Sequence, residues 1–195
     1  IKISVGTVDN NAYLIHPGAG PAILVDAAAE PSRLKALIGN YEVGAVITTH
    51  RHQDHTGALA DIINMTGAQP WCGEPDAEAI EATTGVTCST VWDGDLFRLG
   101  DVKLDVIGLV GHTRGSIALR LQGNPSDHVL TGDSLFPGGV GKTSGSREFE
   151  SLYTDICMKI FAPMSDTTVI HPGHGDATTV GEERPNLPLW RARGW

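Results

Sequence analysis

Cysteine is scarce in this chain, and its spacing excludes two kinds of site. The 195 residues contain three cysteines, Cys72, Cys88 and Cys157, with no C-x-x-C pair. An odd number of widely separated thiols does not form a disulfide framework, and thiolate zinc sites need closely spaced pairs. A reducing, cytoplasmic location is therefore expected.

The chain also has few basic residues and no long apolar run. Lysine and arginine number 14 against 23 acidic residues, which gives a formal net charge of −9. Without a basic stripe, no nucleic-acid partner is expected, because such partners are bound through their phosphates. No stretch approaches the roughly 20 apolar residues that span a bilayer, so no membrane association is expected. The length and the ordinary composition predict a single domain over residues 1–195.

Strand and helix signals alternate through the first half of the chain. The apolar runs 22–25 and 45–49 predict strands, and the segment 31–39 between them predicts a helix that opens with proline and closes with glycine. A helix from about 56 to 65, a short strand that ends at 72 and a helix over 75–83 follow. This order is typical of a layered α/β fold.

The second half is expected to be mainly strands. Residues 89–98 and 102–109 alternate around a Gly-Asp turn and predict a hairpin. Further strands are expected at 116–121, 128–130 and 168–170, a glycine-rich loop at 134–146, and a helix with one apolar face at 148–161.

The strand at 45–49 is followed by a segment rich in metal-binding groups. Residues 50–55 read H-R-H-Q-D-H, which places three imidazoles and one carboxylate within six residues. Imidazole and carboxylate are ligands of zinc, iron and manganese in proteins. This segment therefore predicts a metal site.

Three later strands are expected to end in the same way. His112 follows the strand at 102–109, Asp133 follows 128–130, and His174 follows 168–170, each with a neighbouring glycine. Glycine lets the backbone turn sharply under a ligand. Because ligands bind preferentially at strand ends in layered α/β proteins, we expect these side chains to converge with the segment 50–55.

In this order the four blocks resemble the metallo-β-lactamase fold superfamily, and within it the glyoxalase II group of hydroxyacylglutathione hydrolases. The resemblance covers residue 10 to about residue 183. It implies a four-layer αβ/βα sandwich of two mixed sheets with helices outside. Typical glyoxalase II enzymes continue beyond the last histidine with a helical glutathione-binding domain, so the chain is expected to be a short form without that domain.

The resemblance also implies a set of ligands for two divalent metal ions, with zinc preferred over iron or manganese. The first metal would be bound by His50, His52 and His112. The second would be bound by Asp54, His55 and His174, with Asp133 bridging both ions.

The implied reaction is hydrolysis of a small-molecule acyl thioester of the S-lactoylglutathione type by a metal-bridging hydroxide. Asp54 would orient the hydroxide and receive its proton, and Lys142 would contact an anionic group of the substrate. The tyrosine that many members carry two residues after this lysine is Ser144 here.

Two other activities would use the same residues. Persulfide dioxygenases share these blocks but hold one iron with two histidines and one aspartate, here His50, His112 and Asp133. A lactonase would act on the same metal core. A non-enzymatic metal-binding module is the remaining class, and a ligand set with open coordination positions disfavours it.

Several other polar residues have structural interpretations. His16 and His128 are expected to be ordinary exposed loop histidines. His171 fits a supporting role at the site as well as it fits no role. Asp26 either holds residues of the site in place or accepts a hydrogen bond from a helix N-terminus. The stretch 138–143 lacks the spacing of a phosphate-binding loop.

Overall fold

The computed structural model describes residues 1–194 and contains two six-stranded sheets. The strands of the first sheet lie side by side in chain order: β1 (Lys2–Val5), β2 (Asn10–Ile15), β3 (Ala22–Val25), β4 (Val43–Thr48), β5 (Gln69–Gly73) and β6 (Ser89–Val91). The strands from β1 to β3 are antiparallel, and those from β3 to β6 are parallel. Parallel neighbours need crossover connections, which accounts for the helices in the first half of the chain.

The second sheet has the strand order β14-β13-β10-β9-β8-β7. Its strands are β7 (Leu96–Leu99), β8 (Val102–Gly108), β9 (Ile117–Leu121), β10 (His128–Gly132), β13 (Val169–Pro172) and β14 (Thr178–Thr179). Only the β10–β13 pair in this sheet is parallel. A small hairpin of β11 (Leu135–Phe136) and β12 (Gly139–Val140) stands beside it.

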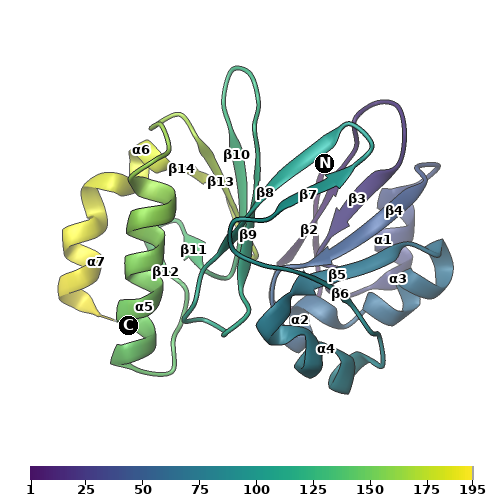
Figure 1. Cartoon of the computed structure of the whole chain (residues 1–195), viewed down its shortest axis with the longest axis horizontal. Helices are drawn as coiled ribbons and strands as arrows, with labels where there is room; N and C mark the ends of the chain where they lie inside the picture. The colour runs from purple at the N-terminus through teal and green to yellow at the C-terminus, as the bar shows by residue number, and fades with distance from the viewer. Residues whose placement is uncertain (195) are drawn as a thin grey trace.

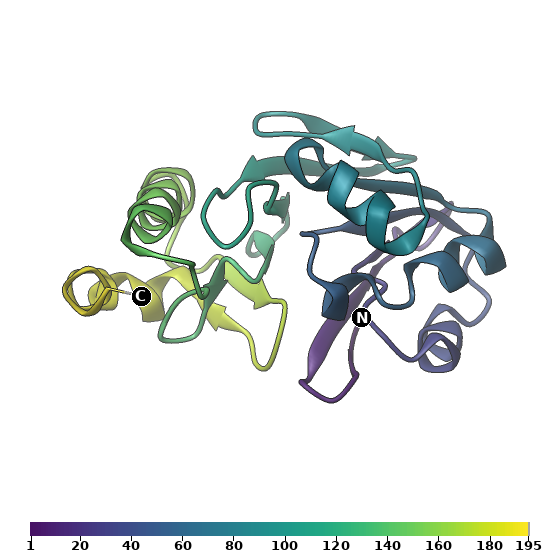
Figure 2. The ribbon, with the colours of Figure 1, turned by 90° about the horizontal axis from the view of Figure 1, so that it is seen from below.

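Helices cover the outer face of each sheet (Figures 1 and 2). The first sheet is covered by α1 (Pro31–Ile38), α3 (Leu59–Thr66) and α4 (Ala77–Thr84), and the second by α5 (Ser146–Ile156) and α7 (Leu187–Arg193). The short helices are α2 (Gln53–Thr56) and α6 (Val180–Glu183). This arrangement confirms the predicted four-layer sandwich. Among residues 1–194, none of the helices has the length and apolar character needed to cross a membrane.

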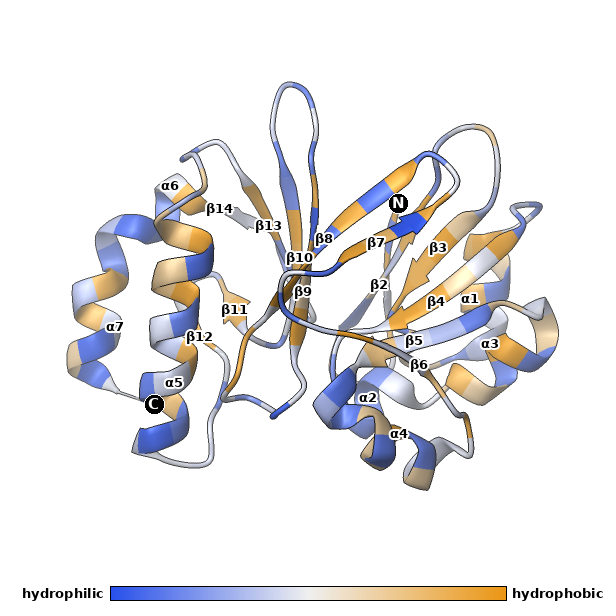
Figure 3. Cartoon of the chain, in the orientation of Figure 1, coloured by the Kyte–Doolittle hydropathy of each residue, from blue (hydrophilic) through white to orange (hydrophobic). Residues whose placement is uncertain are grey.

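Strand β3 shows how the sequence fills two cores at once. Ala22 and Leu24 pack toward the helices, whereas Ile23 and Val25 pack between the sheets, and all four side chains are fully buried. Successive strand residues point to opposite faces, so a strand buried on both sides is apolar throughout. The apolar strands stand out in the interior of Figure 3, flanked by helices with polar outer faces.

The helix predicted from about 56 to 65 is present as α3, but it begins at Leu59 and a separate helical turn precedes it. The chain forms α2, breaks at Gly57 and Ala58, and starts again as α3 at Leu59. A Cβ on Gly57 would come 2.8 Å from the carbonyl oxygen of Ala28, and the amide of Ala58 donates to the carbonyl of Ala27. These contacts come from a distant segment, so local periodicity did not reveal the break.

The predicted 89–109 hairpin is confirmed only for β7 and β8. Residues 89–91 belong to the first sheet and 96–99 to the second, because a turn at Asp93–Asp95 carries the chain across. The amide of Trp92 donates to the Asp95 carboxylate there, and Gly94 has a φ of +91°. The predicted loop 134–146 also contains the β11–β12 hairpin, which was not expected.

Replacing Leu104 by alanine is expected to lower the free energy of unfolding by about 2–5 kcal/mol, because the side chain is fully buried between the sheets. Leu96→Ala is the matched control, since Leu96 is 43% exposed, and a loss below about 1 kcal/mol is expected. Urea unfolding followed by circular dichroism measures both. Equal losses of unfolding free energy in the two variants would contradict the placement of Leu104 in the core between the sheets.

Candidate metal centre

The predicted ligands come from both sheets and meet at the seam between them. From the first sheet, β4 leads to His50 and His52, and α2 carries Asp54 and His55. The second sheet supplies the other three from the loops after its strands: His112 after β8, Asp133 after β10 and His174 after β13.

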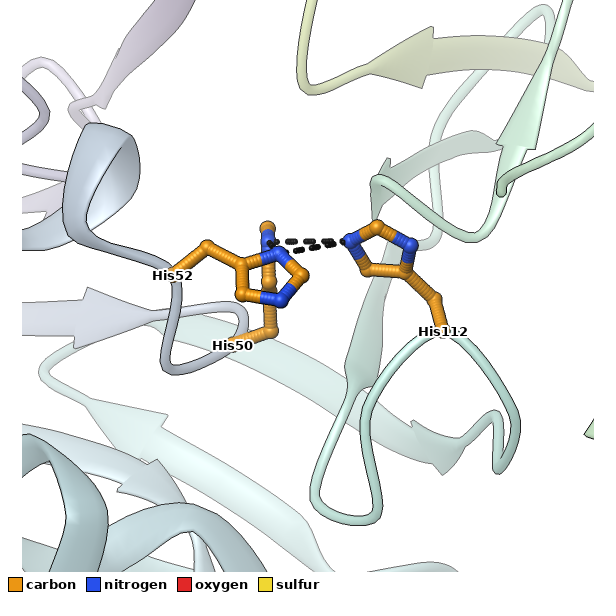
Figure 4. Close-up of side chains that lie close together, drawn as sticks. All are labelled: His50, His52 and His112. Carbon is orange, nitrogen blue, oxygen red and sulfur yellow. Dashed lines mark hydrogen bonds between the residues drawn. The ribbon is translucent and has the colours of Figure 1, made fainter. Parts of the chain in front are cut away.

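Three of the imidazoles face one another across this seam, as Figure 4 shows. The Nε2 atom of His50 lies 3.1 Å from Nδ1 of His52. The Nε2 atom of His112 lies 3.3 Å from Nε2 of His50 and 2.9 Å from Nδ1 of His52. Since His50 is only 1% exposed, this triangle of nitrogens has a buried corner and an open side.

A second group forms beside the first. The Nε2 atom of His174 lies 3.2 Å from Nε2 of His55 and 3.4 Å from Oδ2 of Asp54. Asp133 lies between the groups, with Oδ1 3.2 Å from Nε2 of His55 and Oδ2 3.7 Å from Nε2 of His112. The structure thus brings the seven predicted side chains together. Their binding of metal stays a prediction at this point.

The outer nitrogens of two rings have backbone acceptors. Nδ1 of His112 donates to the carbonyl oxygen of Lys142 at 2.7 Å, and Nδ1 of His174 donates to that of Val8 at 2.7 Å. A neutral imidazole with its proton on Nδ1 has a lone pair on Nε2. When these rings are neutral, both inward nitrogens are therefore acceptors without a proton.

Asp26 holds two further rings in place, that of His55 directly and that of His50 through Thr49. Its buried carboxylate accepts from the amide and hydroxyl of Thr49 at 2.7 and 2.8 Å and from Nδ1 of His55 at 2.8 Å. Because the Thr49 hydroxyl proton is used, its oxygen accepts from Nδ1 of His50 at 3.1 Å. Of the two interpretations of Asp26, the brace is the one that the contacts support.

This donor set fits divalent metal ions. A tetrahedral ion with bonds of 2.0–2.1 Å holds neighbouring nitrogens about 3.3 Å apart, close to the 2.9–3.3 Å within the first group. Unprotonated nitrogens at such distances repel one another unless a cation lies between them. Oδ1 of Asp133 is buried without a hydrogen bond, although Nε2 of His55 lies 3.2 Å away. A cation would satisfy both the nitrogens and this oxygen.

The electrostatics of the cluster also favour a bound cation. Burial lowers the pKa of His50 well below its usual value, and the neighbouring His55 reinforces the shift, so His50 stays neutral. Burial alone would lower the pKa of His55, but the carboxylates of Asp26 and Asp133 outweigh it and raise this pKa to about 10. The cluster attracts positive charge, so protons and metal ions compete for the same nitrogens.

Asp76 is a buried positioning residue that the sequence did not reveal. Its carboxylate accepts from the amide of Arg51 at 3.0 Å, the hydroxyl of Thr113 at 2.6 Å and the amide of Gly115 at 2.9 Å. It thereby ties the loop of His50 to the loop of His112. Like the predicted ligands, Asp76 follows the end of a strand, but its sequence context indicates the start of a helix.

Gly173 leaves room for the cluster. A Cβ at this position would overlap Oδ1 of Asp133 and approach the ring of His55 to 2.7 Å. The sequence predicts glycines beside the ligands for sharp turns, whereas the role of Gly173 is close packing.

The remaining predicted residues lie outside the cluster. Lys142 is exposed, and its carbonyl oxygen accepts from Nδ1 of His112. The role of its side chain in substrate binding stays a prediction. The ring of His171 stacks on His128 and meets Tyr13 edge-on. His16 stacks on the ring of Tyr41.

Asp26→Asn is expected to lower the affinity for metal about 10–100-fold, because it weakens the acceptor that orients His55 and Thr49. Asparagine tolerates the left-handed backbone of Asp26, with its φ of +59°, so the fold is expected to persist. Competition with a coloured chelator measures the affinity. Asp101→Asn, at an exposed turn, is the control, and equal affinities of the two variants would contradict the brace.

Both the sequence and the fold of the chain are similar to those of known proteins. The family model of the metallo-beta-lactamase superfamily matches residues 5–180. The hydroxyacylglutathione hydrolase GloC of Haemophilus influenzae is 27% identical over 209 residues, which cover 98% of this chain and 97% of that enzyme.

Three solved structures are similar along nearly the whole chain. BLEG-1, a B3 metallo-beta-lactamase, has a TM-score of 0.83 at 22% identity. The match covers 97% of this chain and 98% of BLEG-1. At this identity the similarity shows the fold alone. A protein solved in a di-iron-bound form has a TM-score of 0.80 at 26% identity, with 97% and 99% covered. ETHE1 from Myxococcus xanthus has a TM-score of 0.80 at 25% identity, with 98% and 85% covered. The chain belongs to the metallo-beta-lactamase superfamily.

Proposed function

We propose that the chain is a metal-dependent hydrolase of acyl thioesters. The observation that carries this proposal is the convergence of imidazole nitrogens and carboxylate oxygens at one seam. The similarity to an enzyme named hydroxyacylglutathione hydrolase, which this chain matches over 97% of its length, supports the choice of thioesters.

Two groups of side chains would hold two divalent ions. The first would be held by His50, His52 and His112. The second would be held by Asp54, His55 and His174, with Asp133 shared between them. Bound there, such ions would bring the pKa of a coordinated water to about 7 and polarise an acyl carbonyl. Zinc, iron and manganese all accept this combination of nitrogen and oxygen ligands.

Asp54 is the residue best placed to handle the proton of the attacking water. Its Oδ2 accepts from the side-chain amide of Asn10 at 3.0 Å, which fixes the carboxylate, and 43% of the side chain remains exposed. It orients the water toward the acyl carbon and receives the proton that is released. A thiolate leaving group with a pKa of about 8.5 needs little protonation, so a separate general acid is not required.

A second candidate function is a mononuclear iron oxygenase. Two imidazoles and one carboxylate form the ligand set of many non-haem iron oxygenases, and His50, His112 and Asp133 offer it here. The similarity to a protein solved in a di-iron-bound form makes iron relevant. A lactonase, which would use the same ions and the same water, is distinguished by substrate alone.

Protein purified without added metal is expected to contain about two divalent ions per chain and to hydrolyse S-lactoylglutathione. Removal of the ions by a chelator should abolish hydrolysis, and zinc, iron or manganese should restore it. Metal analysis and the release of free thiol measure the two quantities. One iron per chain together with oxygen uptake on a persulfide would instead establish the oxygenase.

Asp54→Asn is expected to lower kcat at least about 100-fold while the free energy of unfolding changes by less than about 1 kcal/mol. The side chain is partly exposed, so its loss affects proton handling and metal binding rather than packing. Asp61→Asn is the matched control, an exposed aspartate on α3. Undiminished thioester turnover by metal-loaded Asp54→Asn would contradict the assignment.

A further inference from the structure

A hollow of about 490 Å³ opens beside the His112 edge of the metal centre. It is lined by the loop that carries His112, by the start of α5 and by Arg51. Three of the nine arginines of the chain line it: Arg51, Arg114 and Arg147. None of them was singled out by the sequence, because they are far apart in the chain.

The charge of this hollow is opposite to that of the whole protein. The chain carries a net charge of −9, yet Glu148 is the one acidic side chain among the described lining residues. Arg51 has only a distant ion pair, 4.0 Å from Asp76. Within residues 1–194 no side-chain hydrogen bond or ion pair is found for Arg114 or Arg147, and both are exposed. Their guanidinium groups are free for an anion.

The arginines are tied to the metal centre by the backbone. Arg51 stands between His50 and His52, and Arg114 is two residues after His112. The buried carboxylate of Asp76 binds the amides of Arg51 and Gly115, so both loops are held in place. A recognition group on a fixed loop loses little freedom on binding, which favours affinity.

The opposite side of the centre has a different character. A second hollow, of about 500 Å³, lies against Asp54 and Gln53 and is lined otherwise by residues 6–8, Asn10, residues 28–29 and Gly57. Its lining residues include no basic side chain and only one acid, Asp54. The positive charge therefore stands on one side of the reacting centre.

We propose that the arginine hollow binds an anionic group of the substrate, a carboxylate or a phosphate, and selects thioesters that carry one. This inference rests on the proposed thioesterase function and names its substrate class. Guanidinium groups match carboxylate and phosphate oxygens in paired hydrogen bonds, which makes them suited to this selection. The group would lie on the His112 side while the thioester carbonyl reaches the metal centre.

Two synthetic thioesters test the selection, 3-(acetylthio)propionate and its neutral amide. Both have the same acyl group and the same leaving sulfur. The metal-loaded wild-type chain is expected to prefer the anion in kcat/KM, and Arg114→Gln and Arg147→Gln should each reduce that preference about tenfold. Arg98→Gln, an exposed arginine on β7, is the matched control and should keep the wild-type ratio. A wild-type chain without preference, or a double variant that retains it, would overturn the proposal.

Equilibrium binding separates this proposal from the thioesterase function. Calorimetry measures the binding of glutarate and of inorganic phosphate without any turnover. It is done on the wild-type chain and on the Arg114→Gln/Arg147→Gln variant. Direct binding of the probe to metal contributes equally in the two proteins. At least about tenfold weaker binding of either probe by the variant is expected, even if neither thioester is hydrolysed. The probe that loses more affinity identifies the anion. Unchanged binding of both would overturn the arginine site and leave the hydrolase proposal standing.

Discussion

The cluster depends on lone pairs that are forced to face one another. The Nδ1 atoms of His50, His55, His112 and His174 each donate to a fixed oxygen, so the Nε2 atom of each neutral ring points a lone pair inward. The deepest ring, that of His50, is 1% exposed, so water screens this end of the site poorly. Such an arrangement is favourable only when positive charge lies within it, which is why we interpret it as a metal centre.

The sandwich fold supplies this constraint by bringing together the ends of strands from two sheets. Each sheet contributes part of the predicted ligand set, and buried carboxylates hold the two parts in place. Asp26 acts beneath His50 and His55, and Asp76 ties the loop of His50 to that of His112. The interior between the sheets is apolar. The buried carboxylates of Asp26 and Asp76 make their hydrogen bonds with residues at the site.

Local signals made much of this molecule predictable. The strand 22–25, the helix that begins at Pro31 and the segment 50–55 each depend on a short stretch of sequence. The unpredicted features depend on distant contacts. The break at Gly57 depends on Ala28, and the exit of residues 89–98 from one sheet to the other depends on a turn at Asp93–Asp95. Asp76 and the arginine hollow are likewise formed by segments that only the fold brings together.

Anomalous X-ray diffraction from crystals grown without chelator tests the central claim most directly. Data collected on either side of the zinc, iron and manganese absorption edges locate each ion and identify its element. We predict two anomalous peaks, one among His50, His52 and His112 and one among Asp54, His55 and His174, on either side of Asp133. Metal-replete protein with no peak at this seam, or with its peaks elsewhere on the chain, would contradict the account.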